Sequence, residues 1–402
     1  MSLFLRYHKQ PIPIRLNLLL IDMKQFTTLL ILVGFFQLTN AQNRVVTTGV
    51  PFLNIAPDAR SASLGDQGVA TSADAFSNHW NPAKYAFTPN ETGAAISYTP
   101  YLSKLVNDIF LADLTYYRAI NDRASWAVGL RYFSLGEIEI GDTPADFLNP
   151  LIERPNEFAL DASYALKLSD NFSMAIQGTF LSSDLKLQSS NNESVAASSV
   201  AVGISGFYES FEVPYSNFSG IWRAGFNLSN IGPKIKYEDE GESDFLPTNL
   251  KLGGGFDFIF DSYNKLAISL ELNKLLVPSP SEPVTDKDGN ITGYKQPDDV
   301  GVLSGIFKSF GDAPDGFSEE LKEFTWALGA EFMYDESFAL RAGYFNESEL
   351  KGARKFITLG AGFKYNIIDI DLSYLISATR VVNPLENTLR FSLTFNFGEE
   401  RY

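Results

Sequence analysis

Residues 49–87 read GVPFLNIAPDARSASLGDQGVATSADAFSNHWNPAKYAF. Prolines and glycines interrupt every helical or strand period in this stretch, at Pro51, Pro57, Gly65, Gly68 and Pro82. The small residues between them allow the chain to fold tightly on itself. After this stretch the sequence becomes a train of short alternating segments that are rich in aromatic residues. A compact irregular segment before many amphipathic strands predicts a barrel built around an internal hatch, which we place at residues 42–90.

The first residues have the pattern of an export signal. Met23 and Lys24 open a short basic region, residues 26–38 are apolar, and Ala41 ends a small-residue cleavage site. The apolar run is too short for a membrane-spanning helix. We therefore expect a leader at residues 1–41, with the signal peptide over 23–41. Residues 1–22 are either a long basic region or a mis-assigned start.

Composition excludes several classes of function. The formal net charge is -16 at pH 7, and an acidic chain lacks the Lys and Arg stripes that bind nucleic acid. The chain has no cysteine, and His79 is the one histidine left after the leader. Thiolate and histidine-cluster metal sites are therefore not expected, and neither is a cofactor. No apolar run after the leader is long enough for a helical span, but a membrane barrel remains possible.

Residues 388–397 give the clearest strand signal. Leu389, Phe391, Leu393, Phe395 and Phe397 share one face, while polar residues occupy the positions between them. A strand of about 9–11 residues, tilted by about 45°, is long enough to cross a bilayer. The same alternation recurs along the chain, for example in residues 125–133, 156–168, 265–273 and 368–376.

Fourteen such segments can be counted, an even number as single-chain bacterial barrels require. They are residues 92–99, 108–119, 123–134, 156–168, 171–182, 198–207, 220–229, 249–260, 264–273, 324–334, 337–346, 354–365, 368–377 and 387–397. Short and long connections alternate between them, and the longest is 274–323; the connection 208–219 is the exception. The sequence predicts an all-β protein, a 14-stranded antiparallel transmembrane β-barrel over residues 91–398 with both termini in the periplasm.

A soluble β-sandwich or propeller is the alternative fold, because alternation alone does not show that the apolar face meets lipid. The segments are longer than the usual strand of about five or six residues, which favours the barrel. No blade-like repeat indicates a propeller.

Charged residues on the polar faces of the strands should point into the lumen. An Arg or Lys at the middle of the lipid face would cost about 2–4 kcal/mol. We expect them to meet polar side chains of the hatch, either in a satisfied structural network or along a conducting path. The candidate network contains Asp58, Arg60, Asp66, His79, Trp80, Asn81, Pro82, Arg341, Asp369 and Asp371.

Two further features bear on function. A Ser–His hydrolase would have to use His79, but no serine is placed near it by a recognisable motif, so no catalytic residue is predicted. The long connection contains apolar residues at helical spacing, Val302, Leu303, Ile306, Phe307 and Phe310. This face either packs against neighbouring loops or forms a partner-docking surface.

Several motifs also resemble a known family. Residues 57–87 resemble the hatch signature of the FadL-like outer-membrane barrels, a small-residue stretch that closes with Asn-Pro-Ala. Residues 49–53 (GVPFL) and 97–102 (SYTPYL) resemble the PorV family, the FadL-type outer-membrane component of the type IX secretion system of Bacteroidetes. The motifs RAG at 341–343, TLGAGF at 358–363 and DIDLSY at 369–374 add to this likeness.

The resemblance implies a barrel that is not itself the protein-conducting pore. It implies a non-enzymatic adaptor in the outer membrane, surrounded by lipid, that binds a SprA/Sov-type translocon. Such an adaptor collects cargo through type IX C-terminal domains and delivers it to an attachment complex containing the sortase PorU. The alternative is a FadL-type transporter of hydrophobic small molecules. Lipopolysaccharide deacylation has also been linked to the family and would have to depend on His79.

Overall fold

The computed structural model describes residues 44–140, 151–185, 188–189, 192–193, 196–237, 243–287, 289, 291–297, 299–381 and 383–400. They belong to the second of two compact units, residues 43–402. The predicted leader lies outside the described residues.

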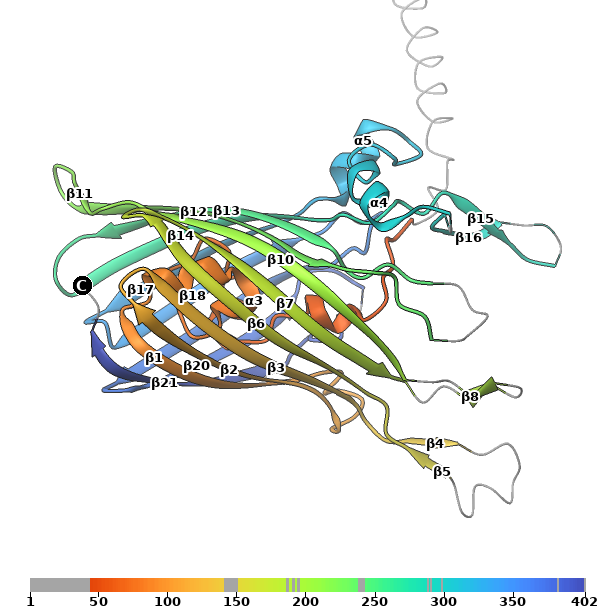
Figure 1. Ribbon diagram of the computed structural model, residues 1–402, viewed down its shortest axis with the longest axis horizontal. Helices are drawn as coiled ribbons and strands as arrows, with labels where there is room; N and C mark the ends of the chain where they lie inside the picture. Colours follow the sequence, from red (N-terminus) through yellow and green to blue (C-terminus); the bar gives the residue numbers. More distant parts are fainter. Residues whose placement is uncertain are drawn as a thin grey trace, which may run out of the picture. The chain divides into compact units, whose positions relative to one another are not determined.

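Fourteen long strands of the described chain form one closed antiparallel barrel (Figure 1). The first seven are β1 (Asn90–Pro100), β2 (Ile109–Asn121), β3 (Ala124–Leu135), β6 (Asn156–Ser169), β7 (Phe172–Asp184), β10 (Ala197–Glu209) and β12 (Ser219–Ile231). The others are β13 (Asn249–Ile259), β14 (Asn264–Leu275), β17 (Thr325–Tyr334), β18 (Phe338–Asn346), β19 (Lys355–Tyr365), β20 (Ile368–Ser377) and β21 (Leu389–Glu400). Each pairs with the next, and β1 pairs with β21 to close the ring.

The remaining strands are short and lie in the connections. Three two-stranded hairpins are formed by β4 (Ile138–Ile140) with β5 (Leu151–Glu153), β8 (Gln188–Ser189) with β9 (Asn192–Glu193), and β15 (Glu282–Thr285) with β16 (Ile291–Lys295). The connection 208–219, the exception to the predicted alternation, contains β11 (Val213–Pro214), which pairs with the start of β12.

The two ends of the barrel differ in their connections. One end, here called the turn end, carries the connections 122–123, 170–171, 210–218, 260–263, 335–337 and 366–367. The other, the loop end, carries 101–108, 136–155, 185–196, 232–248, 276–324, 347–354 and 378–388. The longest of these includes α4 (Val302–Lys308), α5 (Phe317–Glu320) and η4 (Leu321–Glu323). We call residues 276–324 the insertion.

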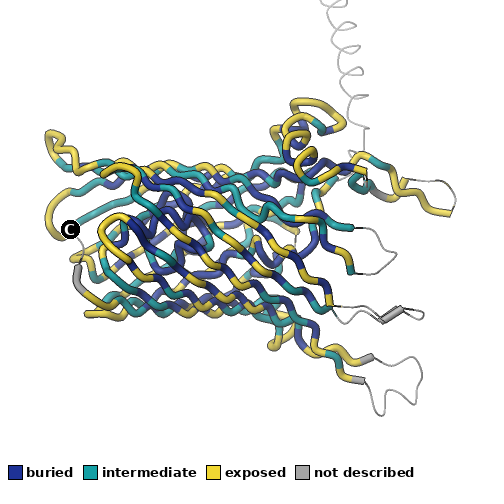
Figure 2. The backbone as a smooth tube through the Cα atoms, viewed as in Figure 1, coloured by how far each residue is buried: buried dark blue, intermediate teal, exposed yellow. Residues whose placement is uncertain are grey.

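The wall has an apolar outer face and a polar inner face. In β21, Leu389 and Phe391 are 57% and 40% exposed, whereas Arg390 and Ser392 between them are buried. The other strands alternate in the same way, as the bands of Figure 2 show. Such an inverted arrangement is expected of a barrel surrounded by lipid. The predicted fold class is confirmed. In the described ranges, no helix has both the length and the apolarity needed to cross a membrane.

The N-terminal segment, residues 44–89, runs through the ring of strands (orange in Figure 1). It contains η1 (Pro51–Asn54), α2 (Ala59–Ser63), α3 (Ser77–Trp80) and η2 (Pro82–Phe87). Helix α2 contacts strands β18 to β21, and η2 contacts β2, β3, β6, β7 and β10 on the other side of the lumen. The segment thus contacts strands on both sides of the lumen.

The described chain begins and ends at opposite ends of the barrel. At the loop end, Arg44 lies 3.2 Å from Glu319 and Gln296 donates to the Thr47 carbonyl at 2.7 Å. Strand β21 runs toward the turn end and stops at Glu400. The expectation that both termini lie on one side is therefore wrong for the described residues. The reason is that an even number of strands returns to its starting side, but the N-terminal segment adds one more passage through the lumen.

Candidate functional site

Three arginines of the wall share one arrangement. Each projects into the lumen between two carboxylates of other strands. The groups are Arg131 with Asp113 and Asp161, Arg223 with Glu209 and Asp257, and Arg341 with Glu331 and Asp371. In the third, Arg341 Nε lies 2.5 Å from Glu331 and Nη1 lies 2.6 Å from Asp371. Buried charges of this kind are tolerated because they are paired and hydrogen-bonded.

A glycine lies two positions from each of these arginines, on the same lumenal face. The pairs are Arg131 with Gly129, Arg223 with Gly225, and Arg341 with Gly343. A Cβ atom on Gly343 would lie 2.1 Å from the backbone nitrogen of Gly65. The glycines therefore let the N-terminal segment approach the wall closely, at Gly225 and Gly343 with its backbone, while the arginines beside them carry the ion pairs.

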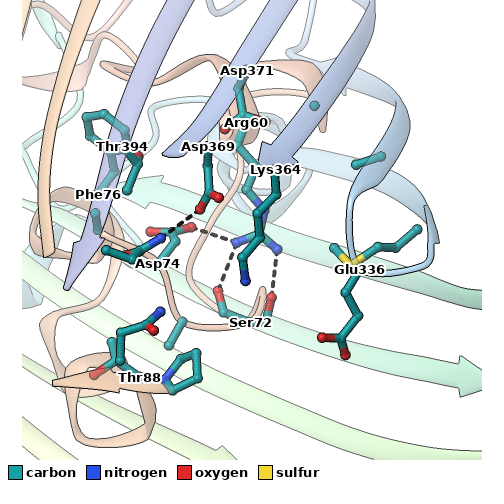
Figure 3. A pocket seen from close by; sticks show the side chains of 18 of the residues that line it. Arg60, Ser72, Asp74, Phe76, Thr88, Glu336, Lys364, Asp369, Asp371 and Thr394 are labelled. Atoms are coloured by element: carbon teal, nitrogen blue, oxygen red, sulfur yellow. Dashed lines mark hydrogen bonds and ion pairs between the residues drawn. The ribbon is translucent and has the colours of Figure 1, made fainter. Parts of the chain in front are cut away.

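Arg60 of α2 joins the N-terminal segment to the third arginine group. Its Nε and Nη2 atoms donate to Glu331 at 3.0 and 2.8 Å, so Glu331 is shared between Arg60 and Arg341. Arg60 also donates to Asp74 at 2.8 Å and to the hydroxyl of Ser72 at 2.6 Å, as Figure 3 shows. The predicted Arg60 and Arg341 thus meet at one carboxylate.

A second contact network surrounds Trp80. Asp58 caps α2 by accepting from a backbone N–H and also accepts from Trp80 Nε1 at 2.7 Å. The Lys251 ammonium lies 4.2 Å from the centre of the Trp80 ring. The His79 ring meets Trp80 edge-on, and its Nδ1 lies 2.8 Å from Arg131 Nη1. His79 Nε2 is buried without a hydrogen-bond partner.

Asn81 and Pro82 are uncharged and fix the backbone at the start of η2. The Asn81 side chain caps η2 and donates to the carbonyls of Val69 and Gly206 at 2.9 and 3.0 Å. Pro82 is the first residue of η2, where its missing N–H costs nothing. These two residues therefore link the segment to itself and to β10.

Two predicted members lie apart from these networks. Asp66 pairs with Arg390 at 2.8 Å, and Asp369 accepts from Asn396 at 2.8 Å at the turn end. The functional role of all ten predicted residues stays a prediction.

Some lumenal charges were missed by the sequence reasoning. Arg223 and Lys251 lie on the polar phase of two predicted strands, so the alternation could have identified them. Lys84 is fully buried and donates to the Gly68 carbonyl at 2.9 Å and to Thr71 at 3.0 Å. No periodic signal exists in the irregular segment that could have revealed it.

A polar cavity opens at the turn end. It has a volume of about 330 Å³. Arg60, Asp74, Glu336, Lys364 and Asp369 are among its lining residues, which Figure 3 shows as sticks. Its lining is rich in charges of both signs, which suits polar ligands better than an apolar one.

A larger cavity, of about 570 Å³, lies at the loop end. Apolar side chains such as Phe52, Tyr101 and Leu385 line it beside the charged Glu157 and Arg354. The turn-end and loop-end cavities share no lining residue. The N-terminal segment therefore separates two distinct openings rather than bordering one passage.

The predicted apolar face of the insertion is divided by the structure. Ile306 is buried, where α4 packs close to Phe245. Leu303, Phe307 and Phe310 remain exposed, and Val302 is half-buried. Part of the face thus packs against a neighbouring loop, and part of it is free.

An ion-pair cluster attaches the insertion to the barrel. Lys274 lies 2.6 Å from Glu320 and 2.8 Å from Glu323, and Lys351 lies 2.7 Å from Glu319 and 2.9 Å from Glu323. Burial alone would raise the pKa of Glu323, but hydrogen bonds, two of them from these lysines, outweigh it and hold that pKa below its usual value. In the described ranges, no group of three or more His, Asp or Glu side chains is placed to hold a metal ion.

Comparison with solved structures shows the fold. A structure described as "TodX deltaS2S3 mutant monoaromatic hydrocarbon channel" is 13% identical, with a TM-score of 0.51, covering 85% of this chain and 99% of that one. The Pseudomonas putida toluene transporter TodX is 13% identical with a TM-score of 0.48, covering 88% and 98%. A Pseudomonas aeruginosa FadL homologue is 13% identical with a TM-score of 0.42, covering 89% and 100%.

Comparison of sequences gives a family rather than a single relative. No curated protein matches the chain. Residues 38–282 match the model of the family described as "Type IX secretion system protein PorV". This match includes the whole N-terminal segment and the strands from β1 to β14.

Proposed function

Because this chain belongs to the PorV family of type IX secretion system proteins, we propose that it is a non-enzymatic adaptor of the outer membrane. It binds a SprA/Sov-type translocon, receives cargo through type IX C-terminal domains, and carries that cargo to the PorU-containing attachment complex. The loop end faces the cell surface in this proposal, and the turn end faces the periplasm.

The filled lumen is the observation that carries the proposal. The N-terminal segment is fixed to the wall by buried ion pairs, such as Arg60 with Glu331, and by close backbone contact at Gly343. A polypeptide could pass only if these charges lost their partners, which costs about 3–5 kcal/mol for a single buried pair. This supports a role in binding at the ends of the barrel rather than in conduction.

The loop-end cavity is the site that best suits a protein segment. It combines apolar side chains such as Phe52 and Leu385 with Glu157 and Arg354, as a mixed peptide requires. The long loops around it add further contact surface. We therefore place the cargo or translocon contact at this end.

The environment of His79 supports a non-enzymatic role. In a hydrolytic triad the Nδ1–H of the histidine donates to a carboxylate, which stabilises the imidazolium. Here Nδ1 faces the guanidinium of Arg131, and Nε2 is buried. A cation in this position opposes proton uptake by the ring.

The second candidate is transport of a hydrophobic small molecule. The loop-end cavity, at about 570 Å³, lies in the size range of small-molecule sites and has an apolar part. The described TodX structures are those of hydrocarbon channels and transporters, but this likeness extends only to the fold.

The test is deletion of the gene in the native host, followed by complementation. We expect cargo secretion and surface attachment to fail in the deletion strain while uptake of hydrophobic compounds is unchanged. Translocon and attachment subunits should co-purify with the tagged barrel in mild detergent. Intact secretion in the deletion strain would overturn the proposal, and lost uptake in its place would favour the transporter.

A further inference from the structure

The outer face of β14 changes character at its loop end. Leu270 and Leu272 are exposed on the lipid-facing side, and Leu272 pairs with Trp326 of β17. Lys274 is the next residue on the same face, yet its side chain is only 1% exposed. The band of exposed apolar residues therefore ends at Leu272, and something covers the wall beyond it.

The cover is the insertion. Lys274 Nζ lies 2.6 Å from Glu320 of α5, 6.0 Å from the centre of the Phe310 ring and 5.1 Å from that of Phe324. The insertion thus packs on the outside of the wall. Figure 1 shows α4 and α5 beside the loop-end part of β13 and β14, outside the ring of strands.

Three glutamates of the insertion face the barrel, while several of its large apolar side chains face away from it. Glu319, Glu320 and Glu323 are taken up by Lys274 and Lys351. Large apolar side chains remain exposed on and beside α4, α5 and η4: Leu303, Phe307, Phe310, Phe317 and Leu321. We call these five residues the apolar shelf. Phe307 and Phe317 are 78% and 77% exposed, which is unusual for phenylalanine in contact with water.

We propose that the apolar shelf enters the outer leaflet of the membrane and is a second lipid-contacting element of this protein. Lys274 lies two residues beyond Leu272, a rise of about 7 Å along the strand. The shelf is therefore level with the boundary between acyl chains and headgroups. Short amphipathic helices rest at this depth, with the apolar face buried by about 5–10 Å.

Continuity with the barrel wall favours lipid over a protein partner. Phe310 is next to Lys274, directly beyond the exposed pair Leu272 and Trp326. A membrane that covers this pair reaches the shelf without a gap. The inference goes beyond the proposed function, because it applies equally to an adaptor and to a small-molecule transporter.

The chain has no cysteine, so single cysteines can report the surroundings of chosen positions. We would attach a nitroxide to Phe307→Cys and Leu321→Cys in full-length barrel reconstituted into bilayers of phosphatidylethanolamine and phosphatidylglycerol. Spin-label accessibility to oxygen and to a water-soluble nickel complex would be compared. Leu270→Cys, on the lipid-facing band, and Val284→Cys, on the exposed β15–β16 hairpin, are the matched lipid and water controls.

Labels at positions 307 and 321 should favour oxygen over nickel, as at position 270. Both labels reading like position 284 would overturn the proposal. The two labels could instead show the nickel accessibility of the water control in the pure barrel and become protected only when the co-purified subunits are added. The shelf would then be a protein-docking surface, and this result would also overturn the proposal. Heat-modifiable gel mobility confirms that each variant is folded.

Discussion

The barrel wall holds two irregular segments in different ways. The N-terminal segment lies inside, where wall glycines such as Gly343 accept its backbone and Glu331 bonds Arg60 of α2. The insertion lies outside at the loop end, where its charges gather around Lys274 and Lys351. The first attachment extends across many strands, whereas the second depends on a few side chains.

This difference separates a permanent part of the barrel from an adjustable one. Removing the N-terminal segment would leave several buried charges without partners at once. The insertion is held by one ion-pair cluster, by the packing of α4 close to Phe245 and by the ion pair of Arg44 with Glu319. We therefore expect the insertion to be released more easily than the N-terminal segment.

The largest effect is expected from Glu331→Ala, which would weaken the inner attachment. The substitution removes the carboxylate shared by Arg60 and Arg341, and breaking a buried pair in this way costs about 3–5 kcal/mol. Urea unfolding in detergent should shift to clearly lower concentration. The control is Glu349→Ala, whose solvent-exposed ion pair with Lys355 contributes little to stability. Equal shifts of the urea midpoint in the two variants would contradict a strong attachment of the N-terminal segment inside the barrel.

A smaller effect is expected from Gly343→Ala. The new Cβ would lie 2.1 Å from the backbone of Gly65, so the segment or the strand must move, at a cost of about 1–3 kcal/mol. Gly254→Ala is the matched control, because its Cβ would meet nothing closer than the Arg223 carbonyl at 3.9 Å. Unfolding of the two variants, followed by gel mobility, should differ. Unchanged stability in both would mean that the inner attachment is adjustable after all.

The contacts of Glu331 and Arg341 show how much of the site the sequence predicts. The turn at 335–337 pairs Tyr334 with Phe338, and this register places Glu331 opposite Arg341. Alternation puts both residues on the lumenal face and so favours this register over a two-residue turn at Asp335 and Glu336, which would put Glu331 opposite Leu340. The contact of Arg341 with Asp371 could not be derived from the sequence, because the Arg341 side chain crosses the intervening strand beside Gly362.

The fold itself followed from alternation, since each of the fourteen predicted segments overlaps one long strand. The path of the N-terminal segment through the lumen did not follow from the sequence. Its prolines and glycines indicate a compact structure but carry no period from which direction could be read. For that reason the sequence could not predict the contact of His79 with Arg131 or the position of Arg44 at the loop end.

The smallest effect is expected from mild acid, which tests the outer attachment. The pKa of Glu319 is also held below its usual value: burial raises it, but hydrogen bonds and charge, chiefly from Lys351, outweigh that effect. A carboxylate with a lowered pKa contributes stability above its ordinary pKa, near 4.5, and the contribution is lost as the pH falls through the folded value. The insertion should therefore loosen below this range, and it should not respond between pH 6 and 8.

A nitroxide at Ser304→Cys, on the exposed side of α4, would report this change as increased mobility in its line shape. Lys274→Met removes one cation of the cluster. In this variant the label at position 304 should already be more mobile at neutral pH and should respond less to acid. A label that stays equally immobile to pH 3 would show that apolar packing, not the ion pairs, holds the insertion. The contrast with the lumen would then be one of position only, because both segments would be permanent parts of the barrel.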